Sequence, residues 1–193
     1  MTDFETQVRE KQKEYRADSY AMSYGEIINL YSSGEIIISP DFQRFYRWNL
    51  NQKSRFIESL ILDLPTPSIF VYQRMDGKWE LVDGLQRLST IFEFAGVLKD
   101  SDGKLAEPSI LAATDKLPLL KGLRWTGVDE NQTLPDSLKL EIKRRKVTVQ
   151  IIQSVSDPSA KYEVLVFPRK NGHEISCGFR QLFKLYRRHE ANA

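Results

Sequence analysis

Five consecutive residues, Asp83-Gly84-Leu85-Gln86-Arg87, have the types and spacing of a phosphate-binding turn. They follow the second strand of a predicted hairpin and precede a helical pattern. A helix N-terminus presents unpaired backbone N–H groups, and Gly84 lets the backbone approach a ligand closely. Arg87 can offer a bidentate fork to phosphate, and Gln86 an amide. Asp83 can hold a Mg²⁺ that carries the phosphates, or orient a water molecule.

The same five residues also have a purely structural interpretation. Asp83 can serve as a helix N-cap, Gly84 as a turn residue and Arg87 as a surface charge. Because Asp-Gly before a helix is frequent, this interpretation is the commoner of the two when the turn is considered by itself.

A second candidate lies at residues 42–48, where arginines alternate with aromatic side chains. Such a run can stack on a base and pair with a phosphate. Alternatively, Phe42, Tyr46 and Trp48 anchor the core while the arginines extend past them to solvent. The run has no clean period, which predicts a loop.

Other chemistry has little support in the sequence. The histidines, His173 and His189, have no partners at metal-ligand spacing, and Cys177 four residues after His173 does not complete a zinc site. The single cysteine excludes an internal disulfide and favours a reducing cytoplasm. No apolar run predicts a membrane span, and the polar N-terminus is unlike a secretory signal. We therefore expect a cytoplasmic protein.

The elements that must position the turn follow from periodicity and indicate an α+β fold. Up to the turn, the pattern predicts a polar helix over 3–18, a helix opened by the capping box Ser23-Tyr24-Gly25-Glu26, a strand at 36–38, a helix beginning at Asn49 or Asn51, and a hairpin of 69–72 and 79–82. After it, the pattern predicts a helix, an irregular insertion over 96–135 with a short helix near 109–113, a helix from Ser137 to Arg145, a strand from Val147 to Ile152, and a helix start at Asp157-Pro158.

Composition fits one globular domain with an appended tail. The chain has 193 residues, of which 41% are hydrophobic and 28% charged, and its net charge is +2. Residues 161–193 hold seven basic and three acidic side chains. Such a tail can contact phosphate backbones, and a solvated surface explains it equally well.

Several motifs occur together in an order and spacing that resemble a known family. They are Pro40-Asp41-Phe42-Gln43-Arg44, Trp48, the helix over 52–60, Pro65-Thr66-Pro67, and Val82 to Ile91 with the turn at its centre. This pattern resembles the N-terminal domain of GmrSD-type restriction enzymes, which is related to the ParB/sulfiredoxin fold. The resemblance is specific from about residue 21 to residue 95.

The resemblance implies a small mixed sheet flanked by helices, with a nucleoside triphosphate pocket linked to hydrolysis in bacterial defence against phage. The family's Asp-Gly-Gln-Gln-Arg signature corresponds to Asp83, Gly84, Gln86 and Arg87, and Leu85 departs from it. The departure is harmless if Leu85 faces the core, and it puts turnover in doubt if the side chain meets nucleotide. A second pocket motif of the family matches at Gln43 and Arg44.

The resemblance also divides the chain. We expect a polar N-terminal helix over 1–20, a nucleotide-binding domain over 21–160 and a basic tail over 161–193, which is either a divergent or a truncated helical extension. In the tail, Phe167-Pro168-Arg169-Lys170-Asn171 keeps only an outline of the family pattern. Larger relatives continue into a nuclease domain, so a nuclease partner subunit is a further expectation.

Three functions are therefore compared. The first is a regulatory module that binds a nucleoside triphosphate with Mg²⁺ and can hydrolyse it, with Asp83, Gln86 and Arg87 as the catalytic group. The second is a non-catalytic module that binds DNA or a partner. The third is a DNA-nicking nuclease, in which Asp83 and Glu80 would bind metal; it ranks last because the two residues lie three apart across a strand end.

Overall fold

The computed structural model describes residues 3–100, 102–127 and 129–154. Its centre is a five-stranded sheet in the order β1-β5-β3-β4-β2. The strands are β1 (Tyr15–Ser23), β2 (Ile36–Ile37), β3 (Ile69–Gln73), β4 (Trp79–Asp83) and β5 (Lys146–Ser154). Pairing is antiparallel for β1 with β5 and for β3 with β4, and parallel for β3 with β5 and for β2 with β4. The expected α+β class with a small mixed sheet is confirmed.

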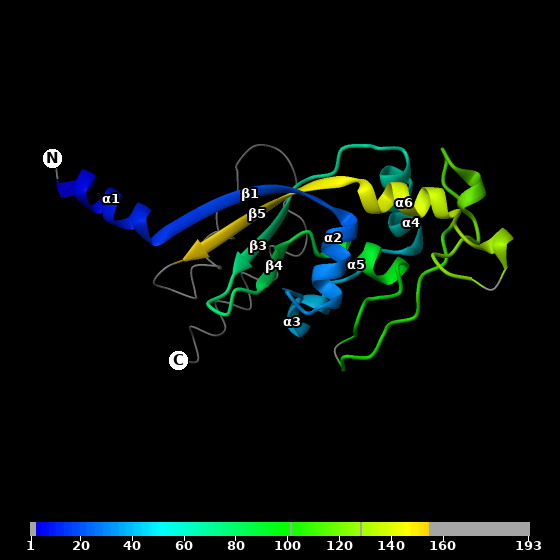
Figure 1. Cartoon of the computed structure of the whole chain (residues 1–193), viewed down its shortest axis with the longest axis horizontal. Helices are drawn as coiled ribbons and strands as arrows, with labels where there is room; N and C mark the ends of the chain where they lie inside the picture. Colours follow the sequence, from blue (N-terminus) through cyan, green and yellow to red (C-terminus); the bar gives the residue numbers. More distant parts are fainter. Residues whose placement is uncertain (1–2, 101, 128, 155–193) are drawn as a thin grey trace.

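The chain also forms the helices α1 (Asp3–Glu14), α2 (Tyr24–Ser32), α3 (Pro40–Gln43), α4 (Leu50–Ile61), α5 (Leu85–Phe94) and α6 (Asp136–Arg144). All of them except α1 cover one part of the sheet (Figure 1). In Figure 1, α2 to α6 gather at one end of the sheet, whereas β1 and β5 run on beyond them as a two-stranded ribbon with α1 at its tip. The helices are all too short or too polar to cross a membrane, as far as the chain is described.

Two helix starts follow the sequence closely. The Ser23 hydroxyl accepts from the Glu26 N–H at 3.1 Å, which fixes the first turn of α2. Asn49 and Gln52 form a reciprocal capping box at the start of α4, each side chain accepting from the other's backbone N–H at 3.0 Å. Because a cap of this kind satisfies two otherwise unpaired donors, it sets where α4 begins and where the preceding segment must end.

The core lies between the sheet and the helices. Val149 of β5 is opposite Ile69 of β3, and both are buried with Leu88 of α5 in one apolar cluster. Tyr31 of α2 stacks on Phe92 of α5, with ring centroids 4.1 Å apart. These contacts fix α5, and therefore the turn before it, against the sheet.

The insertion between α5 and α6 is tied to α4 by polar contacts. The Ser54 hydroxyl accepts from the Ala112 N–H at 2.8 Å, and Thr114 donates to the buried carboxylate of Glu58. Residues 109–113 form no helix, so that prediction is wrong; a 3₁₀ turn lies instead at Pro118–Leu120. Hydrogen bonds to α4 hold this stretch without a regular backbone pattern, which periodicity does not detect.

Two further predictions need correction. The N-terminal helix ends at Glu14, not near residue 18, because Tyr15–Ser23 pairs along its whole length with β5. The predicted loop before Trp48 contains the short helix α3, which Pro40 opens at its first turn. The predictions for the helix start at Asp157-Pro158 and for the tail over 161–193 lie outside the described residues.

Candidate functional site

The turn before α5 depends on glycine for two reasons. Gly84 has a φ of +104°, a region that L side chains rarely adopt. A Cβ at this position would lie 2.5 Å from Cδ1 of Ile69 on β3. On the side of Gly84 that faces β3, Ile69 thus fills the space in which we expected a ligand to approach the backbone. Gly84 also has no side chain with which to cap the first N–H groups of α5.

Leu85, the departure from the family signature, points into the core. Its side chain is 5% exposed and belongs to the main apolar cluster. The departure therefore takes no polar group away from the surface of the turn, and of the two outcomes considered for Leu85 the structure shows the harmless one.

Arg87 holds the loop that precedes β3. Its guanidinium donates to the carbonyl oxygen of Pro67 and, at 3.1 Å, to that of Ser68. It also lies 3.6 Å from the Asp83 carboxylate, and the two side chains are 13% and 27% exposed. Burial lowers the pKa of Arg87, while the neighbouring Asp83 opposes that change. Much of the hydrogen-bonding capacity of Arg87 is therefore committed to the protein itself.

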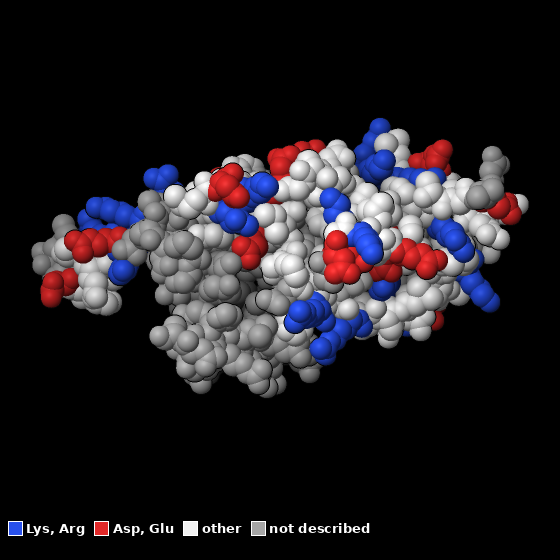
Figure 2. Space-filling model, turned by 90° about the horizontal axis from the view of Figure 1, so that it is seen from below, with Lys and Arg blue, Asp and Glu red and all other residues white. Residues whose placement is uncertain are grey.

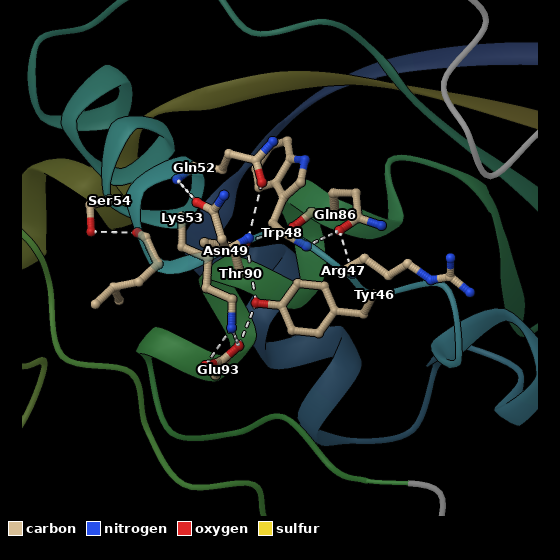
Figure 3. A network of polar contacts seen from close by, with 11 residues as sticks. Tyr46, Arg47, Trp48, Asn49, Gln52, Lys53, Ser54, Gln86, Thr90 and Glu93 are labelled. Atoms are coloured by element: carbon tan, nitrogen blue, oxygen red, sulfur yellow. Dashed lines mark hydrogen bonds and ion pairs between the residues drawn. The ribbon is translucent and has the colours of Figure 1, made fainter.

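Gln86 joins the two motifs that the sequence singled out. Its Oε1 accepts from the backbone N–H of Arg47 at 3.0 Å and of Trp48 at 3.1 Å (Figure 3). Its Nε2 donates to the carbonyl oxygen of Phe45. A single side-chain amide thus satisfies three backbone groups of the segment 45–48. We call this contact between residues 45–48 and the turn 83–87 the joint.

A second polar cluster holds the joint from the side of α4. Tyr46 donates to the Glu93 carboxylate, which also accepts from Nζ of Lys53 at 2.8 and 2.6 Å. The Lys53 ammonium lies 4.5 Å from the centre of the Tyr46 ring. Burial and the hydrogen bond to Glu93 raise the pKa of Tyr46. Sequence reasoning missed Lys53 and Glu93, because charged residues at helical spacing are usually surface positions.

The remaining predicted residues lie on α3 and just after it. Nε2 of Gln43 donates to the carbonyl oxygen of Lys99 at 3.0 Å, so this amide holds the chain that follows α5. The Arg44 side chain is exposed. The structure therefore joins the turn to residues 45–48 of the arginine and aromatic run, while Gln43 contacts the segment at Lys99 instead.

Magnesium, which the sequence predicts at Asp83, can be tested against the residues present. Asp83 offers one partly exposed carboxylate at the turn. In the ranges that the structure describes, no group of three or more His, Cys, Asp or Glu is arranged to hold a metal ion. Mg²⁺ is commonly held by one or two carboxylates together with substrate phosphates. The residues fit an ion that arrives with a nucleotide, and they do not form a dedicated metal cage.

Comparison with known proteins gives one match. Residues 24–185 match the family model described as GmrSD restriction endonuclease, N-terminal domain. No curated protein and no solved structure matches significantly. The ParB/sulfiredoxin-like topology therefore stays a prediction, while the matched range contains both halves of the joint.

Proposed function

The chain belongs to the family of GmrSD restriction endonuclease N-terminal domains, and from this membership we propose that it binds a nucleoside triphosphate at the joint. In this proposal the domain is the regulatory module of a DNA restriction or anti-phage defence system. The bound nucleotide would report to a nuclease partner, and hydrolysis would reset the module.

The observation that carries the proposal is the triple contact of Gln86 with residues 45–48. It places two motifs that are about 40 residues apart in the chain on one surface, next to the N-terminus of α5. A helix N-terminus favours an anion, Arg47 on the segment that Gln86 holds has an exposed side chain, and so does Arg44 just before that segment. These are the ingredients of a phosphate site.

Each residue of the turn has a part in this proposal. Asp83 would hold the Mg²⁺ that accompanies the phosphates and would orient the attacking water. Mg²⁺ would neutralise phosphate charge when bound. Gln86 and Arg87, which contact backbone carbonyl groups in the structure, would keep the two motifs and the loop at Pro67 in place around the nucleotide. Gln43 would hold the neighbouring segment at Lys99.

The test is calorimetric titration with ATP, GTP, CTP and UTP in the presence of Mg²⁺, with phosphate release measured in the same samples. Gln86→Ala should abolish binding while the far-ultraviolet circular dichroism stays native, because it breaks the joint. Arg55→Ala is the matched control, since Arg55 pairs with Asp115 on the exposed side of α4. A parent protein that binds none of the four nucleotides would contradict the proposal.

One observation favours a second candidate, a non-catalytic module that binds DNA or a nuclease partner. Gln86 and Arg87 form hydrogen bonds with backbone groups, so the signature residues can have a purely structural role. Figure 2, however, shows Lys and Arg interspersed with Asp and Glu on its face, without a continuous basic area over the described residues. DNA binding through phosphates should weaken steeply between about 50 and 200 mM salt; an affinity that does not change with salt would count against this candidate.

A further inference from the structure

Two arginines belong to the joint, and their surroundings differ. Arg87 is on the helix itself, while Arg47 is on the segment whose backbone Gln86 holds. The family signature points to Arg87 as the phosphate ligand. The contacts in the structure indicate different roles for the two arginines.

The guanidinium of Arg87 is largely used by the protein. It donates to the carbonyl oxygens of Pro67 and Ser68, lies 3.6 Å from Asp83, and is 13% exposed. To bind phosphate fully, it would have to give up the hydrogen bonds to these two carbonyl groups, of which the one to Ser68 is part-buried and costs free energy to lose. Arg87 is therefore a positioning residue for the loop before β3.

Arg47 is held by its backbone and leaves its side chain available. Its N–H donates to Gln86 at 3.0 Å, and the adjacent Tyr46 is fixed by Glu93. In Figure 3 the Arg47 side chain extends away from this cluster. Its guanidinium lies 5.9 Å from the centre of the Phe45 ring, and no carboxylate of the described residues lies within ion-pair distance of it.

A fixed backbone together with an available guanidinium suits a residue that binds phosphate. A cation on a segment that is already ordered loses less conformational freedom on binding than one on a free loop. An exposed guanidinium offers a planar fork that matches two phosphate oxygens. Arg44 is exposed on the same stretch, but Arg47 is the one whose own amide is bound to the first turn of α5.

We propose that Arg47, and not Arg87, is the guanidinium that contacts the triphosphate of the bound nucleotide. This inference rests on the proposed function, because it names the residue that recognises the phosphates at the same site. Arg87 keeps the loop in place, and Arg47 binds the ligand.

The experiment titrates the parent, Arg47→Ala, Arg47→Lys, Arg87→Ala and the control Arg55→Ala with the four nucleoside triphosphates and with inorganic tripolyphosphate. Thermal unfolding of each variant is recorded as well. Arg47→Ala should weaken both kinds of ligand by at least about tenfold, since it removes charge-assisted hydrogen bonds, and its melting temperature should stay that of the parent. Arg47→Lys should recover part of the affinity, because the charge returns without the fork. Arg87→Ala should lower the melting temperature.

The outcomes separate the two proposals. If the parent binds nucleotide and Arg47→Ala binds it within about twofold of the parent, the assignment to Arg47 is wrong and the proposed function stands. If a folded Arg87→Ala loses binding and Arg47→Ala keeps it, the phosphate ligand is Arg87. If the parent binds neither nucleotide nor tripolyphosphate, the proposed function fails and this inference fails with it.

Discussion

The two ends of the sheet hold their polar side chains in different ways. At the joint, Gln86 and Arg87 each satisfy backbone groups of another segment, and three of these hydrogen bonds are partly shielded from solvent. In the ribbon of β1 and β5, residues 16–21 are exposed, and Tyr20 donates to its near neighbour Asp18. The side chains of the joint therefore connect distant segments, whereas the Asp18–Tyr20 contact of the ribbon is local.

This difference indicates where sequence changes should matter. A hydrogen bond that is shielded from water costs more to lose than an exposed one, because an unpaired buried group has no solvent to replace its partner. The joint should thus be sensitive to single substitutions, and the ribbon tolerant of them. The signature residues of the family serve the first kind of contact, which ties the proposed ligand site to the stability of the fold.

The largest effect is expected for Gly84→Ala. The new methyl group would have to occupy the space of Ile69, and the residue would have to keep a φ of +104°. We expect a loss of about 3 kcal/mol in the free energy of unfolding, from the left-handed backbone and from overpacking together. Urea unfolding followed by circular dichroism measures it.

Gly77→Ala is the matched control for this change. Gly77 has a φ of +81° in the hairpin turn, but a Cβ there would have no neighbour within 4 Å. Only the backbone cost of about 1 kcal/mol should remain. Equal losses in the two variants would show that Ile69 moves aside freely, and the account of the turn would then be wrong.

A second, smaller effect should separate the joint from the ribbon. Gln86→Ala leaves the N–H groups of Arg47 and Trp48 and the carbonyl of Phe45 without their partner. The expected loss is about 2 kcal/mol of unfolding free energy. Gln153→Ala, which removes a single part-buried contact between β5 and Gln73 of β3, should cost only about 1 kcal/mol, because one hydrogen bond is lost and not three. The same urea titration compares them, and a larger loss at Gln153 would reverse the comparison.

The third prediction concerns alkaline pH. Burial and Glu93 raise the pKa of Tyr46 in the folded protein. The unfolded chain therefore releases this proton first, near pH 10, so the stability that Tyr46 contributes is complete below that pH and is lost as the pH rises. Tyr46→Phe should cost about 1 kcal/mol near neutral pH and should show a shallower loss at alkaline pH.

Unfolding free energies measured from pH 8 to 11 test this expectation. Tyr24 and Tyr31 also have raised pKa values, mainly through burial, so some alkaline loss should persist in the variant. If the parent and Tyr46→Phe lose stability in parallel across this range, the hydrogen bond to Glu93 does not couple the titration of Tyr46 to folding.

Much of the fold followed from the sequence, for reasons that the same comparison explains. The hairpin around Gly77 and the capped helix α4 were predictable because local turn and capping chemistry specifies them. The strand β1 was missed because its pairing with β5 joins residues more than a hundred positions apart and its exposed face has no apolar alternation. Local periodicity carries no information on such a partner.

That the predicted residues form a ligand site stays a prediction, and their contacts within the protein did not follow from the sequence. The turn 83–87 and the run 42–48 were both candidates for phosphate binding, and Gln86 joins them. That Gln86 and Arg87 would bind backbone groups, and that Lys53 and Glu93 would hold Tyr46, depends on which segments the fold brings together. Residue types specify what a side chain can bind, and the tertiary structure selects its partner.

The smallest effect is expected for Tyr20→Phe in the ribbon. The Tyr20 ring is 50% exposed, and its hydroxyl donates at 2.7 Å to Asp18, which raises the pKa of Tyr20. Water can replace an exposed hydrogen bond of this kind, so the free energy of unfolding should not change measurably. Tyr46→Phe is the counterpart from the shielded joint. If Tyr20→Phe proves as costly as Tyr46→Phe in the same urea titration, the ribbon is as strongly coupled to the fold as the joint is, and the contrast between the two ends of the sheet does not hold.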